Sequence, residues 1–114
     1  MLRSALTVLL LAGPTVAALA ATDAELKQQI IGAWGQDPNC AAGALTFVDD
    51  GTFTIERTGA DSQAGRWDIV GGILTGTASD GGKQPDATVR IDGDSLYLGA
   101  PEGSRVETLN RCPG

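Results

Sequence analysis

Pairs of turn-forming residues divide this chain into short segments. The close spacing of these turns is the feature that most limits the folds the chain can adopt. Asp50-Gly51, Gly71-Gly72, Gly81-Gly82 and Gly93-Asp94 can all adopt the positive φ of tight hairpin turns. The segments between such turns are typical of strands. We therefore expect eight short strands joined mostly by hairpins, over residues 33–35, 44–48, 52–57, 64–70, 73–78, 87–92, 95–99 and 105–111.

Apolar residues alternate with polar ones along most of these segments, which predicts a sheet with one apolar face. The apolar positions are Leu45, Phe47, Phe53, Ile55, Trp67, Ile69, Val89, Ile91, Leu96 and Leu98. The last strand is less regular, because Val106 and Leu109 are out of phase, which suggests a bulge. A sheet with one apolar face can cover that face most simply by closing into a barrel.

One helix is expected before the first strand. Thr22-Asp23-Ala24-Glu25 has the form of a capping box, and Leu26 and Ile30 share one face of a helix that ends near Gly32. The fold class predicted is all-β: a small eight-stranded up-and-down β-barrel preceded by one short N-terminal helix.

The first twenty residues have the features of a secretory signal peptide. Arg3 precedes an apolar run over residues 6–12, and Ala18-Leu19-Ala20 is an A-x-A cleavage signal. The run is too short for a membrane anchor and is followed by Gly13-Pro14. We expect cleavage near Ala20, localisation in the periplasm or outside the cell, and a single small β-barrel domain over residues 21–114.

Two cysteines, Cys40 and Cys112, lie in the exported part of the chain. Small exported domains often need a covalent link, because their cores are small. A disulfide between Cys40 and Cys112 is therefore the default expectation.

The charge balance is acidic. After residue 20 there are fourteen acidic residues and seven basic ones, since Arg3 is the one basic residue removed, which gives a net charge of about −7. Such a surface disfavours nucleic acid and anionic membranes as partners. The charges are scattered along the chain, as expected if they serve solubility.

Candidate catalytic groups are few. The chain contains no histidine, so a Ser-His-Asp triad and an imidazole metal site are excluded. Asp49 and Asp50 adjoin Gly51 and are better explained by a hairpin turn than by acid–base catalysis. Asp92-Gly93-Asp94 begins like a calcium loop, but Leu96 occupies the third ligand position. We expect no enzyme activity, no metal and no cofactor.

The order helix, Gly32-Ala33-Trp34 and eight-stranded barrel resembles the calycin superfamily, which includes the lipocalins. In lipocalins the G-x-W tryptophan closes one barrel end beneath an arginine near the end of the last strand. The resemblance implies these roles for Trp34 and Arg111. In size, the chain is also similar to small bacterial periplasmic inhibitors of secreted metalloproteases.

Two functional classes follow. The first is a non-enzymatic protein that binds another envelope or secreted protein, as an inhibitor or accessory factor, with Asp37, Asn39 and Asp61 as candidate loop contacts. The second is a small lipocalin-like carrier of an apolar ligand. The two classes differ in whether side chains fill the barrel interior, because a carrier needs a cavity there. The apolar residues expected to face inward are bulky, which favours a filled interior and hence the first class.

Overall fold

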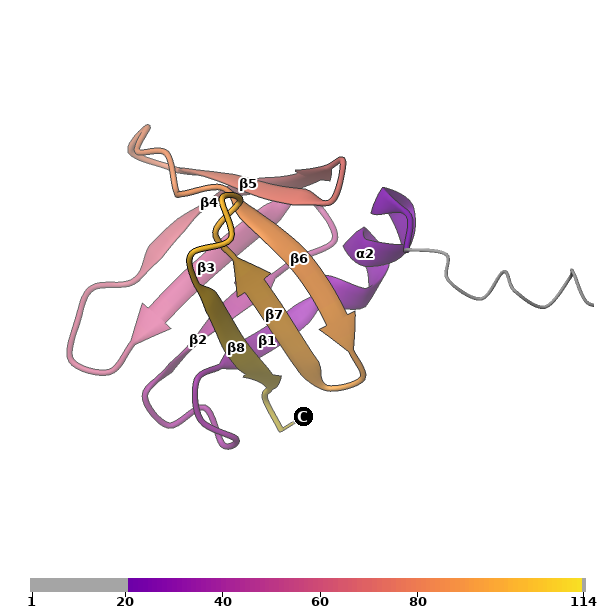
Figure 1. The fold of residues 1–114 in the computed structure, drawn as a ribbon. Helices are drawn as coiled ribbons and strands as arrows, with labels where there is room; N and C mark the ends of the chain where they lie inside the picture. Colours follow the sequence, from indigo (N-terminus) through magenta and orange to yellow (C-terminus); the bar gives the residue numbers. More distant parts are fainter. Residues whose placement is uncertain (1–20, 114) are drawn as a thin grey trace, which may run out of the picture.

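The computed structural model describes residues 21–113, and the predicted signal peptide over 1–20 lies outside them. Helix α2 (Asp23–Ile30) leads into eight antiparallel strands that form a closed barrel in sequence order, with β8 pairing back onto β1 (Figure 1). The predicted fold class is confirmed. The strands are β1 (Gly32–Gly35), β2 (Gly43–Phe47), β3 (Thr52–Arg57), β4 (Gln63–Val70), β5 (Ile73–Ala78), β6 (Ala87–Asp92), β7 (Ser95–Gly99) and β8 (Val106–Arg111).

The two ends of the barrel differ because the strands alternate in direction. The turns after β2, β4 and β6 are short and lie at the end where α2 enters β1. Gly71 and Gly72, between β4 and β5, both have positive φ, 63° and 78°, as a two-residue hairpin turn requires. The connections after β1, β3, β5 and β7 are longer and lie at the opposite end.

The apolar core is densest at the α2 end. Trp34 and Ile30 are fully buried, and the whole buried cluster comprises Leu26, Ile30, Trp34, Phe47, Phe53, Ile69, Leu96 and Leu109. Other inward side chains remain only partly buried: Leu45, Ile55, Trp67, Leu74, Val89, Ile91 and Leu98. The interior is therefore packed at one end and incompletely filled at the other.

The last strand carries no bulge against β7. Its residues pair one to one with that strand, from Gly99 opposite Val106 to Ser95 opposite Asn110. Val106 points outward and is 66% exposed, whereas Leu109 is buried. The suggested bulge is wrong, because Leu109 alone sets the phase of the strand.

Helix α2 begins with the expected capping box. The Thr22 hydroxyl accepts a hydrogen bond from the Glu25 backbone N–H (3.1 Å), and the Glu25 carboxylate accepts one from the Thr22 N–H (2.8 Å). These bonds satisfy two groups that a helix N-terminus leaves without partners. Leu26 and Ile30, on one face of the helix, are both buried in the core.

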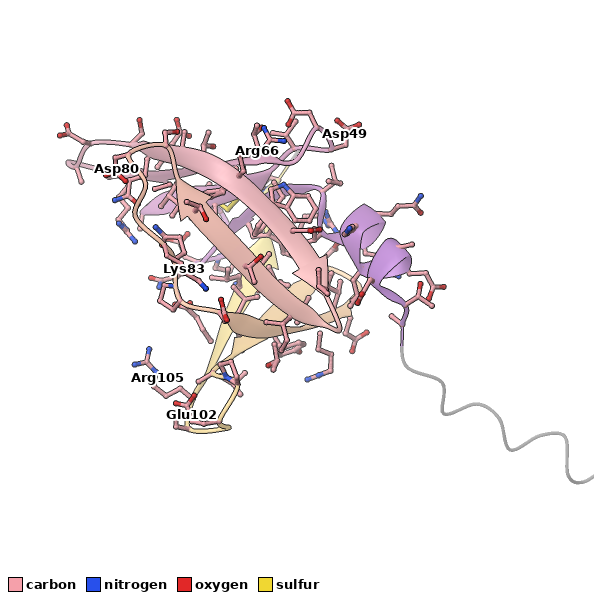
Figure 2. The ribbon with its side chains drawn as sticks, turned by 90° about the horizontal axis from the view of Figure 1, so that it is seen from above. Asp49, Arg66, Asp80, Lys83, Glu102 and Arg105 are labelled. Carbon is pink, nitrogen blue, oxygen red and sulfur yellow. A yellow bond between two sulfur atoms is a disulfide. The ribbon has the colours of Figure 1, made fainter. Side chains whose placement is uncertain are left out.

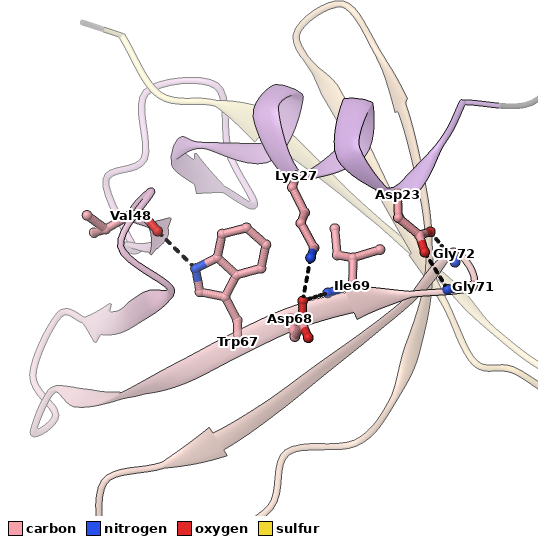
Figure 3. Close-up of polar contacts among 8 residues, drawn as sticks. All are labelled: Asp23, Lys27, Val48, Trp67, Asp68, Ile69, Gly71 and Gly72. Carbon is pink, nitrogen blue, oxygen red and sulfur yellow. Dashed lines mark hydrogen bonds and ion pairs between the residues drawn. The ribbon is translucent and has the colours of Figure 1, made fainter.

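Polar contacts fix the helix across the end of the barrel (Figure 3). The Asp23 carboxylate accepts hydrogen bonds from the backbone N–H groups of Gly71 (2.8 Å) and Gly72 (2.9 Å). The Lys27 ammonium lies 2.8 Å from the Asp68 carboxylate on β4. The helix is thus held by one side chain at a turn and by another at a strand.

A disulfide joins Cys40 and Cys112, as predicted, with their Cα atoms 5.6 Å apart. It packs over β1: a Cβ atom added at Gly35 would lie 2.5 Å from the Cys40 sulfur, so only glycine fits there. The bond links the loop after β1 to the residue that follows β8. It is typical of proteins in oxidising compartments such as the periplasm or the extracellular space.

No helix within residues 21–113 has the length and apolar character needed to cross a bilayer.

Removing the disulfide should destabilise the fold strongly. It closes a loop of 72 residues, which corresponds to about 4 kcal/mol of loop-closure entropy. The double variant Cys40→Ala/Cys112→Ala should therefore lose about 4 kcal/mol in free energy of unfolding, measured in guanidinium chloride. An unchanged unfolding free energy, or two free thiols in the folded protein, would contradict this role.

The Lys27–Asp68 ion pair should make stability depend on pH. The pKa of Asp68 is lowered, mainly because the Lys27 ammonium donates a hydrogen bond to its carboxylate. Such a group stabilises the fold above its unfolded pKa, and this contribution is lost as pH falls through the folded pKa. We expect wild type to be more stable than Asp68→Asn at neutral pH and the difference to vanish in acid.

Urea unfolding across a pH series measures this difference. Lys27→Gln, which removes the other partner, should give the same loss at neutral pH. A difference between wild type and Asp68→Asn that is equal at neutral and acidic pH would rule out the ion pair as its source.

Candidate functional site

The closed end of the barrel is built on Trp34 and Arg111. These residues pair across β1 and β8, and the Arg111 guanidinium carbon lies 4.2 Å from the centre of the Trp34 ring. The stacking that the resemblance implied is present. Gly32 makes room for it: its φ is 126°, and an added Cβ would lie 3.1 Å from an Arg111 nitrogen. The guanidinium also contacts the Asp94 carboxylate at 3.3 Å.

The same two side chains bind the C-terminal carbonyl groups of α2. Arg111 donates hydrogen bonds to Gln29 O (3.1 Å) and Ile31 O (3.2 Å), and the Trp34 indole N–H donates one to Ile30 O (2.9 Å). A helix C-terminus leaves such carbonyls without intrahelical partners, and its dipole favours a cation there. This role cannot be predicted from the sequence, because it depends on where the helix docks.

The opposite end of the barrel opens into a cavity of about 1170 Å³. This volume lies slightly above the range of ordinary ligand sites, which span about 300–1,000 Å³. Its barrel wall is apolar, and its mouth is formed by the chain around residues 83–87 and 98–107. The wall residues are Leu45, Phe47, Phe53, Ile55, Trp67, Leu74 and Leu98. The filled interior that the bulky residues predicted is therefore not found at this end.

Small residues lie on the inner faces of β4 and β5, and one of them, Gly76, lines the cavity. Trp67 pairs with Gly76, and Gly65 pairs with Ala78, so glycine or alanine occupies three of these four inward positions. The Phe53 ring lies over both glycines: an added Cβ would be 2.8 Å from it at Gly65 and 3.5 Å at Gly76. A count of large apolar residues overlooks these positions, although alternation from Trp67 and Leu74 could have located them.

Trp67 makes a hydrogen bond and an aromatic contact in the cavity wall. Its indole N–H donates a hydrogen bond to Val48 O at 3.1 Å (Figure 3). Its ring meets the edge of Phe47, with ring centres 5.3 Å apart and planes at 78°. This environment makes Trp67 a natural fluorescent reporter of cavity occupancy.

A second hollow of about 440 Å³ lies beside the junction of β1 and β8. These strands pair through only two residue pairs, Trp34 with Arg111 and Gly35 with Asn110. Beyond them the wall is lined by residues of β2, β3 and β8 and the adjoining loops. Leu45, Ile55 and Glu107 line both hollows, so the two spaces adjoin along this part of the wall.

Charged residues surround the cavity mouth, on two connections at the side away from α2 (Figure 2). Lys83 and Asp86 form an exposed ion pair at 3.6 Å. On the connection between β7 and β8, the Ser104 hydroxyl donates a hydrogen bond to Glu102. This bond is the main reason that the pKa of Glu102 is lowered, and the charge of Arg105 adds a smaller effect.

The three residues predicted as loop contacts, Asp37, Asn39 and Asp61, do not line either of the two hollows. Asp37 and Asn39 order their own loop, since both side chains accept a hydrogen bond from the Ala41 N–H, at 2.9 and 3.1 Å. Asp61 is exposed between β3 and β4. Among the residues that line the two hollows, none of these three is present, so the structure does not bring them together at one site.

Comparisons with known protein families, curated proteins and solved structures found no match for this chain. The class of protein is therefore described by its fold alone. It is a closed eight-stranded antiparallel barrel, consistent with a calycin-like architecture, with one end sealed by a helix and the other open to a cavity.

Disrupting the closed end should destabilise the protein in a graded way. Trp34→Ala removes a fully buried aromatic side chain and should cost about 3–5 kcal/mol. Arg111→Ala removes two hydrogen bonds to carbonyl groups and the stacking contact, and should cost about 1–3 kcal/mol.

Arg111→Lys is the matched control for this prediction. It keeps the charge but loses the planar group that stacks and donates in two directions, so it should recover little of the lost stability in chemical denaturation. Near-wild-type stability of Trp34→Ala would show that Trp34 does not seal the barrel.

Proposed function

We propose that the protein is a non-catalytic, lipocalin-like carrier that binds an apolar ligand inside its barrel. The observation that carries this proposal is the cavity of about 1170 Å³ with its wall of leucine, isoleucine and aromatic side chains. The predicted signal peptide would deliver the carrier to the periplasm or the medium. The absence of histidine from the chain supports binding over acid–base catalysis.

The cavity wall offers enough apolar contact for useful affinity. Each buried methylene contributes about 0.8 kcal/mol, so a tail of about ten carbons would gain up to about 8 kcal/mol. Association costs reduce this gain. We therefore expect dissociation constants between about 1 µM and 1 mM.

The other functional class, binding of an envelope or secreted protein as an inhibitor of the metalloprotease-inhibitor kind, has less support. Two of the polar loop residues that would contact a partner, Asp37 and Asn39, already serve the Ala41 N–H within their own loop. An apolar cavity is not required for such a role. The carrier proposal uses the feature of the barrel that the protein-binding proposal leaves unexplained.

A neutral amphiphile tests the carrier proposal. Decan-1-ol titrated into the protein should shift or quench the fluorescence of Trp67 with saturable, one-to-one binding. Trp67→Phe should abolish the signal while calorimetry still reports binding, which assigns the signal to Trp67 and not to the buried Trp34.

Filling the cavity should abolish binding without unfolding the protein. At Gly76 an added Cβ would meet neighbours only at ordinary contact distances of 3.5–3.6 Å, so Gly76→Leu should fold and project its side chain into the cavity. Thr77→Leu places the same side chain at the next, exposed position and should bind normally. Binding of decanol that is equal in both variants, or absent in wild type, would refute the carrier proposal.

A further inference from the structure

The inner wall of the barrel carries a carboxylate near the open end. Glu107 on β8 pairs with Leu98 on β7, just as Leu109 pairs with Leu96. Paired residues and residues two apart share one face of a sheet. Because Leu96 and Leu109 are buried in the core, Glu107 shares the inward face. It lines the wall of both hollows together with Leu45 and Ile55.

Glu107 differs from the charged residues of the mouth in its position, because it lies on the inward face of β8, although its side chain is exposed at this open end. Its carboxylate accepts a hydrogen bond from the Gln36 side-chain amide at 3.1 Å, so that partner is neutral. Around the mouth, Lys83 pairs with Asp86 at 3.6 Å, and Arg105 lies close enough to act on Glu102. Each basic residue of the lining therefore has an acidic neighbour.

The charge balance of the lining follows. Two basic and three acidic residues line the larger cavity: Lys83, Arg105, Asp86, Glu102 and Glu107. Their formal sum is one negative charge, which corresponds to Glu107. An anionic head group would meet this carboxylate, and Lys83, one of the two cations, is already paired with Asp86. A cationic head group would meet Glu107, the carboxylate of this lining that lies on the inward face of a strand.

We propose that the cavity selects amphiphiles with a cationic amine head group, whose apolar tail lies along the barrel wall and whose head lies against Glu107. This inference rests on the proposed carrier function and specifies its ligand class. An amine offers hydrogen-bond donors to a carboxylate that only accepts, and such charge-assisted bonds are stronger than neutral ones. The apolar neighbours Leu45, Ile55 and Leu98 leave the tail in contact with hydrocarbon below the head.

Three ligands with the same ten-carbon tail separate head-group charge from tail burial: decylammonium, decan-1-ol and decanoate, titrated at pH 7 below their aggregation concentrations. Wild type should bind decylammonium about tenfold more tightly than decanol, and decanoate more weakly than decanol. Glu107→Gln keeps the shape of the side chain and should bind decylammonium and decanol equally.

Glu102→Gln is the matched control, because it removes the same charge from the mouth but leaves Glu107 in place. It should keep the preference for decylammonium, which separates the effect of Glu107 from general attraction to an acidic protein. Equal affinities of wild type for the three ligands, or a preference that survives Glu107→Gln, would overturn the selection of amines and leave the carrier function standing. Absence of binding by all three ligands would refute the carrier function itself.

Discussion

The stacking of Arg111 on Trp34 is the interaction on which the rest of this structure depends. It joins the last strand to the first across the closure of the barrel. Both side chains also bind the terminal carbonyls of the helix. One contact therefore fixes the closure of the sheet and the position of the helix, and the disulfide from Cys112, the next residue, adds a covalent link to the loop after β1.

Sealing one end in this way allows the other end to remain open. Large side chains gather near the helix, where Ile30, Trp34, Ile69 and Leu96 are almost completely buried. Farther along the barrel, small residues such as Gly76 and Ala87 line the cavity. A small domain has little stability to spare, so dense packing, helix capping and the disulfide at one end can offset the apolar contacts that the cavity gives up at the other.

Electrostatics distinguishes the cavity from a plain apolar hollow. The Lys83–Asp86 ion pair at the mouth is exposed and contributes little to stability, but its two charges neutralise one another locally. Glu107 is also exposed, but it lies on the inner face of β8 and has an amide partner. The proposed carrier function depends on the apolar wall, whereas the proposed choice of ligand depends on this one carboxylate.

The sequence by itself determined the helix start, the number and order of the strands and the disulfide. Turn glycines and the Thr22–Glu25 capping box act on neighbouring residues, and with only two cysteines in the chain there is only one possible disulfide. Only the tertiary structure decided that the barrel has a cavity at the end away from α2 and that Glu107 lies on the inward face of β8. Val106 and Leu109 are both apolar, so the phase of β8 was ambiguous until its pairing with β7 was known. Cavity volume likewise depends on the sizes of side chains from many strands. A local sequence pattern does not determine the strand register that brings these side chains together.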